Sequence, residues 1–349
     1  MSFTPIPIRR RSWYRKSLFA GLMLLMVLLF LLNLKIGPVS YGWGEIWSYL
    51  REGGADSRRL IITEIRFPAA LVSLLAGAAL AVGGLLMQTL FRNPLADPSI
   101  MGVSSGAGLG VALLTMAGGR LAGTSLLNTG MYGQIGVIIA AFAGALAVMA
   151  LIMAFAFRMQ SATRLLILGV MIGYLSFSAI SFLKFFSLSE DLKYYVVWGL
   201  GSFSAVSSQQ LPLMALALGL ALIAGILLVK PLNMLWLGEA VASGLGINIR
   251  RTRLHIILVS GFLTAVVTAF CGPIAFIGLA VPHLGRSLLA SADHLLLIPL
   301  SVLLGADLAL VVNLVSRLPV FGGALPVNAL TALIGAPVVI VFLWKWKNL

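Results

Sequence analysis

The stretch GAALAVGGLLMQTLFRNPLADPSIMGVSSGAG, residues 77–108, joins two apolar runs through a polar turn that contains two prolines. Each proline removes a backbone donor and clashes with the preceding helical turn, so the first run must end there. Asn93 and Asp97 can hydrogen-bond the backbone groups that are freed. We call residues 92–102 the elbow. It is either a tight turn between helices or a rigid constriction beside a pathway, and these residues alone favour neither interpretation.

The rest of the chain is equally apolar. Of its 349 residues, 60% are hydrophobic and only 10% are charged, which is typical of a membrane protein. A helix needs about 20 apolar residues to cross a bilayer core about 30 Å thick. Ten runs approach that length: 18–36, 68–91, 100–118, 133–157, 165–186, 211–229, 254–271, 274–290, 295–314 and 327–344. We therefore predict an all-α polytopic membrane protein with about ten transmembrane helices in a single domain, 1–349.

The net charge of +14 reflects membrane topology rather than nucleic-acid binding. With ten spans both termini lie on one side, and fifteen of the 24 basic residues fall on that side. Only three acids accompany them: Asp97, Glu239 and Asp293. This excess predicts that both termini, including an N-terminal tail over residues 1–17, are cytoplasmic. It also predicts attraction to anionic membrane lipid.

A second motif, LNMLWLGEAVASGLGINIRR (232–251), separates the sixth and seventh runs on the same side. Residues 237–244 fit a short helix, with Gly244 and Gly246 suited to its C-terminal cap. Its small residues would fit a groove on a partner protein. The alternative is an ordinary connector, but its length and order favour a docking loop over about 232–250.

No catalytic constellation is apparent. Cys271 is the single cysteine, and no Gly-Lys dipeptide is present for a phosphate-binding loop, so we expect no catalytic residue, no metal site and no cofactor bound by this chain. His283, in GPIAFIGLAVPHLGR (272–286), fits a packing role better than a ligand role. Asp307 is the only acid well inside a run, and either has a function or hydrogen-bonds a neighbouring helix. An ion-driven secondary transporter would need several such residues, and a membrane scaffold would need neither the elbow nor the loop.

Taken together, the motifs resemble the FecCD family, the permease subunits of type II ABC importers for iron–siderophore complexes, haem and vitamin B12. The matching segments are IRFP (65–68), residues 77–108, RLLILGV (164–170), WGLGS (198–202), LNMLWLGEAVASGLG (232–246), GPIAFIGLAVPHLGR (272–286) and LPVNALTALIGAPV (325–338). The resemblance implies a cell inner membrane permease that works with a second permease subunit, for which a copy of the same chain is favoured over a paralogue. It also implies two cytoplasmic ATPases, which bind ATP and Mg, and a periplasmic or lipid-anchored binding protein. A ferric siderophore is the favoured cargo because much of the family transports one.

The resemblance also implies roles for individual residues. The cytoplasmic gate would comprise Asn93, Leu95, Ser161, Ala162 and Thr163. The segment that couples to the ATPase would comprise Leu237, Gly238, Glu239, Ala242, Gly244, Leu245 and Gly246. Arg66 and Arg317 would pair with the binding protein. The chain departs from the family pattern at Ala69, Asn313, Ala324 and Asn328, which puts the detail of binding-protein docking and of the outer gate in doubt.

Overall fold

The computed structural model describes residues 8–39, 41–51, 57–118, 131–158, 161–318 and 324–346. Every regular element in these ranges is a helix. Each of the ten predicted runs corresponds to one helix or to two consecutive ones: α1 (Ile8–Lys35), η1 and α4 (Ile61–Arg66, Phe67–Phe91), α5 and η2 (Val103–Ala112, Leu113–Gly118), α7 (Met131–Ala156), α8 (Ala162–Phe185), α10 and α11 (Leu211–Leu227, Val229–Leu237), α13 (Ile249–Cys271), α14 (Ile277–Leu289), α15 (His294–Ser316) and α16 (Val327–Trp346). The all-α prediction is confirmed.

The helices differ in length. Among the described residues six are long and apolar enough to cross a membrane, and a seventh is added if α10 and α11, bent by 47°, form one span. The helix α14 has only 13 residues, because Gly272 and Phe276 have positive φ values and hold residues 272–276 out of helix. The predicted break between the seventh and eighth runs is therefore confirmed, but the eighth helix is shorter than the predicted 274–290.

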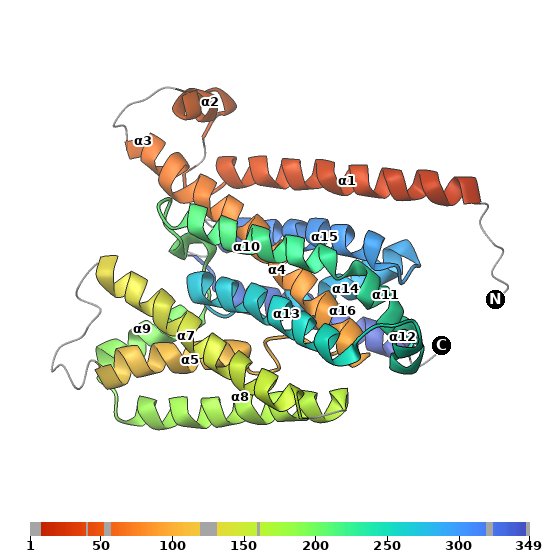
Figure 1. Cartoon of the computed structure of the whole chain (residues 1–349). Coiled ribbons are helices and arrows are strands. Elements are labelled where there is room, and N and C mark those ends of the chain that lie inside the picture. Colours follow the sequence, from red (N-terminus) through yellow and green to blue (C-terminus); the bar gives the residue numbers. More distant parts are fainter. Residues whose placement is uncertain are drawn as a thin grey trace.

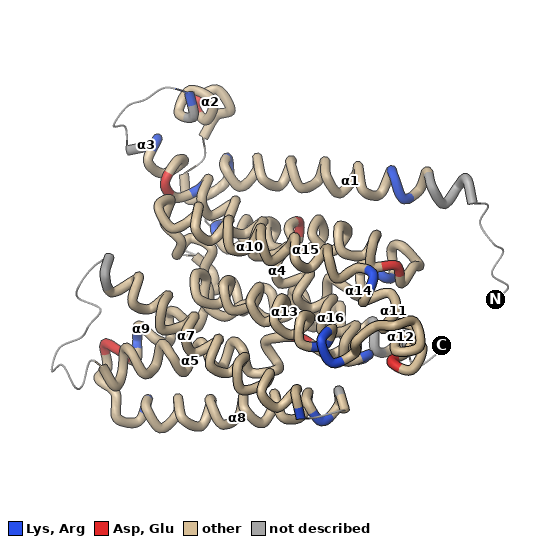
Figure 2. Tube along the Cα trace, viewed as in Figure 1, with Lys and Arg blue, Asp and Glu red and all other residues tan. Residues whose placement is uncertain are grey.

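The long helices run back and forth between two ends of the bundle (Figure 1). We call them the α12 end and the α2 end. The α12 end holds the beginning of α1, the elbow and the short helix α12 (Glu239–Gly244). The α2 end holds α2 (Trp43–Arg51), α3 (Ser57–Leu60) and α9 (Ser189–Gly199). Basic residues of α8, α13 and α14 gather at the α12 end (Figure 2).

Small residues allow the helices to approach closely. A Cβ atom added to Gly77 of α4 would lie 2.1 Å from the carbonyl oxygen of Gly305 on α15, and the reverse contact would be 2.3 Å. Gly110 of α5 approaches the backbone of Ala140 on α7 in the same way, at 2.0 Å. Close backbone packing replaces the hydrophobic effect as the association force in lipid. These contacts place α4, most of whose residues are buried, at the centre of the bundle.

Candidate functional site

The elbow is held in one shape by its own side chains. After α4 ends at Phe91, Arg92 adopts a left-handed conformation, with φ of 47°. Asn93 Oδ1 accepts a hydrogen bond from the Leu95 backbone N–H at 2.9 Å, and Asp97 Oδ1 accepts one from Ser99 N–H at 2.8 Å. Each of these hydrogen bonds closes a tight turn and gives a partner to a backbone N–H that lies outside a helix. The elbow is therefore an ordered element, and Leu95 projects from it as an exposed apolar side chain.

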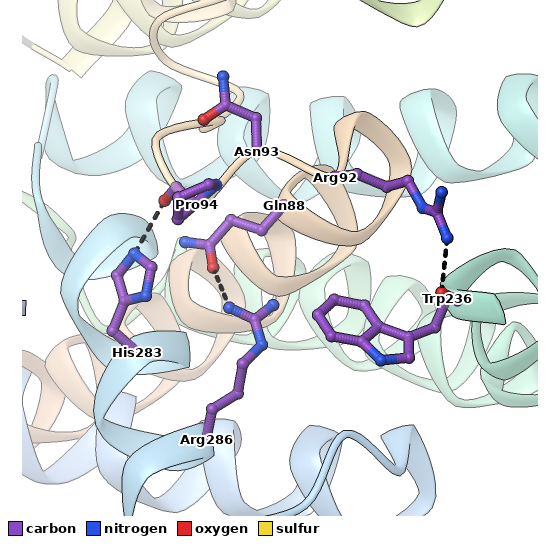
Figure 3. A pocket seen from close by; sticks show the side chains of 7 residues that line it. All are labelled: Gln88, Arg92, Asn93, Pro94, Trp236, His283 and Arg286. Atoms are coloured by element: carbon purple, nitrogen blue, oxygen red, sulfur yellow. Dashed lines mark hydrogen bonds between the residues drawn. The ribbon is translucent and has the colours of Figure 1, made fainter. Parts of the chain in front are cut away.

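Neighbouring helices fix the elbow from two sides. Nε2 of His283, on α14, donates to the carbonyl oxygen of Pro94 at 2.8 Å (Figure 3). This contact satisfies the packing role predicted for His283. On the other side, a Cβ atom added to Gly169 of α8 would lie 3.0 Å from the backbone of Met101. The elbow therefore lies between α14 and α8.

The second predicted gate segment begins α8. Ser161 is the N-cap of this helix, and its Oγ accepts from the Arg164 N–H at 3.4 Å. Thr163 is exposed in the first turn. Ala162 is the first residue of α8, but its side chain lies outside the described residues. Because Met101 packs on α8, the structure connects both predicted gate segments to one helix.

The predicted coupling segment consists of the end of α11 and all of α12. Gly238, with φ of 125°, separates the two helices, and the helix over Glu239–Gly244 matches the one predicted at 237–244. Gly246, with φ of 87°, donates to the Ser243 carbonyl, and Ile247 N–H donates to the Ala242 carbonyl. This pair of bonds is the C-terminal cap that glycine favours.

Within residues 237–245, some side chains hold the segment against the rest of the protein and others form an exposed surface. Arg253 of α13 forms an ion pair with Glu239 at 2.9 Å, and Ala242 is completely buried. Leu237, Val241 and Leu245 are 63%, 49% and 58% exposed. The structure therefore moves Ala242 from contact surface to support. Val241 also belongs to this exposed surface, and its spacing of four from Leu245 was a visible signal of a shared helix face.

One hydrogen bond joins the elbow to this segment. Nη2 of Arg92 donates to the carbonyl oxygen of Trp236, near the end of α11, at 2.7 Å (Figure 3). A cavity of about 570 Å³ lies beside this link. It is lined by Gln88, Arg92, Asn93, Pro94, Trp236, His283 and Arg286. Gln88, Trp236 and Arg286 were not predicted as site residues, although an isolated glutamine between apolar residues was a visible signal.

The two predicted docking arginines lie in different environments at the α2 end. Arg66 is 3% exposed and donates to the carbonyl oxygens of Leu34 and Lys35, in the last turn of α1, and of Val39, just beyond it. Arg317 follows α15 and donates from Nη2 to Ser204 Oγ at 2.7 Å. Its Nη1 is buried without a hydrogen-bond partner in the described ranges, and burial lowers the pKa of Arg317 to about 10.

Two of the four departures from the family pattern, Asn313 and Asn328, form hydrogen bonds between segments. Asn313 donates to Asn33 Oδ1 at 2.9 Å and reaches the Ala69 carbonyl at 3.4 Å, which connects α15 to α1 and α4. Asn328 Oδ1 accepts from Ala275 N–H at 3.1 Å. Ala324 is exposed.

The structure bears on one of the two roles considered for Asp307, a hydrogen bond to a neighbouring helix. Both of its carboxylate oxygens are buried, and neither has a hydrogen-bond partner within the described part of the chain. This hydrogen bond to a neighbouring helix is therefore not seen among these residues.

Comparison with known proteins extends these observations to nearly the whole chain. Residues 24–345 match the model of the FecCD transport family. The vitamin B12 import system permease protein BtuC of Klebsiella pneumoniae subsp. pneumoniae is 37% identical over 337 residues, which cover 96% of this chain and 94% of that protein. BtuC of Shigella boydii serotype 18 is 37% identical over 309 residues, with 87% and 90% covered.

A solved structure gives the same result for the fold. It is described as an inward-facing conformation of a transporter assigned to the metal-chelate ABC type. It superposes with a TM-score of 0.81 at 31% sequence identity, covering 95% of this chain and 99% of that one. The family model and the relatives together span almost every described helix, and so this chain belongs to the FecCD transport family.

Proposed function

We propose that the chain is the permease subunit of a BtuC-like type II ABC importer in the cell inner membrane. The gathering of basic residues at the α12 end supports a cytoplasmic location for that end and for both termini (Figure 2). The α2 end would then face the binding protein. Two permease subunits, either identical or paralogous, would enclose the pathway, and two ATPases would bind ATP and Mg below them.

The observation that carries this proposal is the bond from Arg92 to the Trp236 carbonyl. It joins the elbow to the end of α11, only a few residues before α12. Val241 and Leu245 are exposed apolar side chains four residues apart at α12, a spacing that suits a helix entering a groove on a partner, and the exposed Leu237 precedes them at the end of α11. When ATP closes the ATPases, a displacement of α12 would reach the elbow through α11 and move Asn93 and Leu95. Ser161, Ala162 and Thr163 would complete the gate at the start of α8.

We propose Arg317 as the principal contact for the binding protein, because a partly buried cation with an N–H that has no partner among the described residues is stabilised by an incoming carboxylate. Arg66 would contribute less, since three backbone carbonyls already occupy it. We expect Arg317→Glu to weaken capture of the binding protein about tenfold at low salt, and less at high salt. Arg164→Glu makes the same charge change at the α12 end and should leave capture unchanged. Equal capture by both variants would mean that docking uses other residues.

The cargo we propose is a bulky metal chelate. The relatives are named for vitamin B12 import, which adds weight to cobalamin as the cargo. The other two candidates are haem and the ferric siderophore that the sequence analysis favoured. The test is to reconstitute the chain with its ATPase and binding protein in vesicles and to measure ATP-dependent uptake of all three cargoes. We expect uptake of one cargo, lost without ATP. Uptake driven by an ion gradient without the ATPase would contradict the proposal and favour a secondary transporter.

A further inference from the structure

The cavity at the α12 end contains an arginine whose charge is not balanced. Nη1 of Arg286 donates to Gln88 Oε1 at 2.6 Å, but Nε and Nη2 are buried and have no hydrogen-bond partner among the described residues. The ion pairs found in these residues are Arg58–Glu45 and Arg253–Glu239, so Arg286 takes part in neither. A buried cation without hydrogen-bonded compensation is costly to maintain. The described residues therefore supply no acceptor for two of the donor atoms of Arg286.

The surrounding residues hold Arg286 in position. The amide nitrogen of Gln88 donates to the carbonyl oxygens of Gly278 and Leu279 at 3.2 and 3.3 Å, which directs Oε1 toward the guanidinium. The guanidinium also lies 5.6 Å from the ring centroid of Trp236. Figure 3 shows Arg286 extending between Gln88 and this ring. Both contacts orient the cation, and neither neutralises it.

A second cation lies at the same cavity. Arg92 is exposed and uses Nη2 for the Trp236 carbonyl. The acids on adjoining segments are engaged elsewhere: Asp97 Oδ1 accepts from Ser99, and Asp293 Oδ1 accepts from Asn233 and Leu295 N–H. Among the described residues, the lining of the cavity includes two arginines and no acidic residue.

We propose that this cavity binds a phosphate-bearing anion, which is either the headgroup of an anionic phospholipid or a free phosphate. The Nε and Nη2 atoms of Arg286 form one edge of the guanidinium, and this edge matches two oxygens of one phosphate. Arg92 provides additional positive charge. A volume of about 570 Å³ leaves room for a headgroup larger than the phosphate itself.

The position of the cavity gives binding a structural consequence. Arg286 belongs to α14, whereas Arg92 belongs to the elbow and holds the end of α11. An anion between these two arginines would connect α14 to the link between elbow and coupling segment. This inference goes beyond the proposed function and does not depend on it, because binding can be measured without transport.

The experiment uses the full chain purified in a neutral detergent, with binding followed by native mass spectrometry and by the shift in thermal unfolding. The probes are phosphatidylglycerol, phosphatidylcholine and inorganic phosphate. We expect Arg286→Gln to weaken binding of the preferred anionic probe by about tenfold to a hundredfold, which corresponds to the loss of hydrogen bonds to a charged group. Arg251→Gln removes an exposed arginine at the same end and is the matched control.

The outcomes separate the two sources. Binding of phosphatidylglycerol but not of inorganic phosphate identifies a lipid headgroup site, and binding of inorganic phosphate identifies a small-anion site. Arg286→Lys keeps the charge without the two-pronged edge, so it should recover only part of the affinity. If Arg286→Gln expresses poorly, the affinity of Arg286→Lys provides the test in its place. Binding of neither anion by the wild-type chain, or equal binding by Arg286→Gln and Arg251→Gln, overturns the proposal.

Discussion

The helix α4 and the helix α12 show two opposite uses of glycine. In α4, a Cβ atom added to Gly84 would lie 1.9 Å from the carbonyl oxygen of Gly278 on α14. In α12, a Cβ atom added to Gly244 would meet nothing within 4 Å. The first glycine permits helix packing inside the protein, and the second leaves an open surface. The contrast is between a helix packed tightly inside the bundle and a short helix with an open surface, which is the surface that we assign to the ATPase under the proposed function.

We expect the largest effect on stability from filling the contact between Gly84 of α4 and Gly278 of α14. Gly84→Leu would force α4 and α14 apart, and overpacking of this kind costs about 1–3 kcal/mol and occasionally more. We expect most of the folded protein to be lost, as measured by the monodisperse yield in detergent and by thermal unfolding. Gly219→Leu is the control, because nothing lies within 4 Å of a Cβ atom there. Equal yields and melting temperatures for the two variants would contradict close packing at α4.

A smaller, more specific effect is expected at α12. Gly244→Trp should leave the fold intact, because the site is open, but should block the surface that we assign to the ATPase. We expect ATPase capture and ATP-dependent uptake to fall by about tenfold or more, as for an obstruction at the centre of an interface. Expression and melting temperature should match those of Gly219→Trp. Full uptake by Gly244→Trp would remove α12 from the coupling role.

The same contrast explains which features the sequence could predict. Hydrophobic runs, the short helix at residues 239–244 and the cap at Gly246 depend on residues close together in the chain, and these predictions are confirmed. By contrast, Arg66 donates hydrogen bonds to backbone carbonyls at the end of α1, about thirty residues earlier in the chain. The contact between Gln88 and Arg286 joins residues 198 positions apart. Such pairings are set by helix packing, which local periodicity does not encode.

Asp307 and α14 show the same limit. An acid within an apolar run was visible in the sequence, but whether a partner lies opposite depends on which helix packs there. The short length of α14 follows from the left-handed backbone at Phe276, which no composition rule predicts for a phenylalanine.

The smallest expected effect tests how α12 is held. If α12 moves as a unit with α13, the ion pair between Glu239 and Arg253 must contribute to its position. The Glu239 carboxylate is 45% exposed, so solvent screening limits the pair to about 0.5–1 kcal/mol. Glu239→Gln and Arg253→Gln should each weaken ATPase binding about two- to fivefold, and the double variant should be no worse than either alone.

Hydrogen exchange at residues 239–247 provides a second measurement, because loosening α12 should speed exchange there while exchange in α4 stays unchanged. Strictly additive losses in the double variant would mean that the two side chains act separately. The support of α12 would then rest on the buried Ala242 and on the Arg92 link, and the elbow rather than α13 would set the position of the coupling surface.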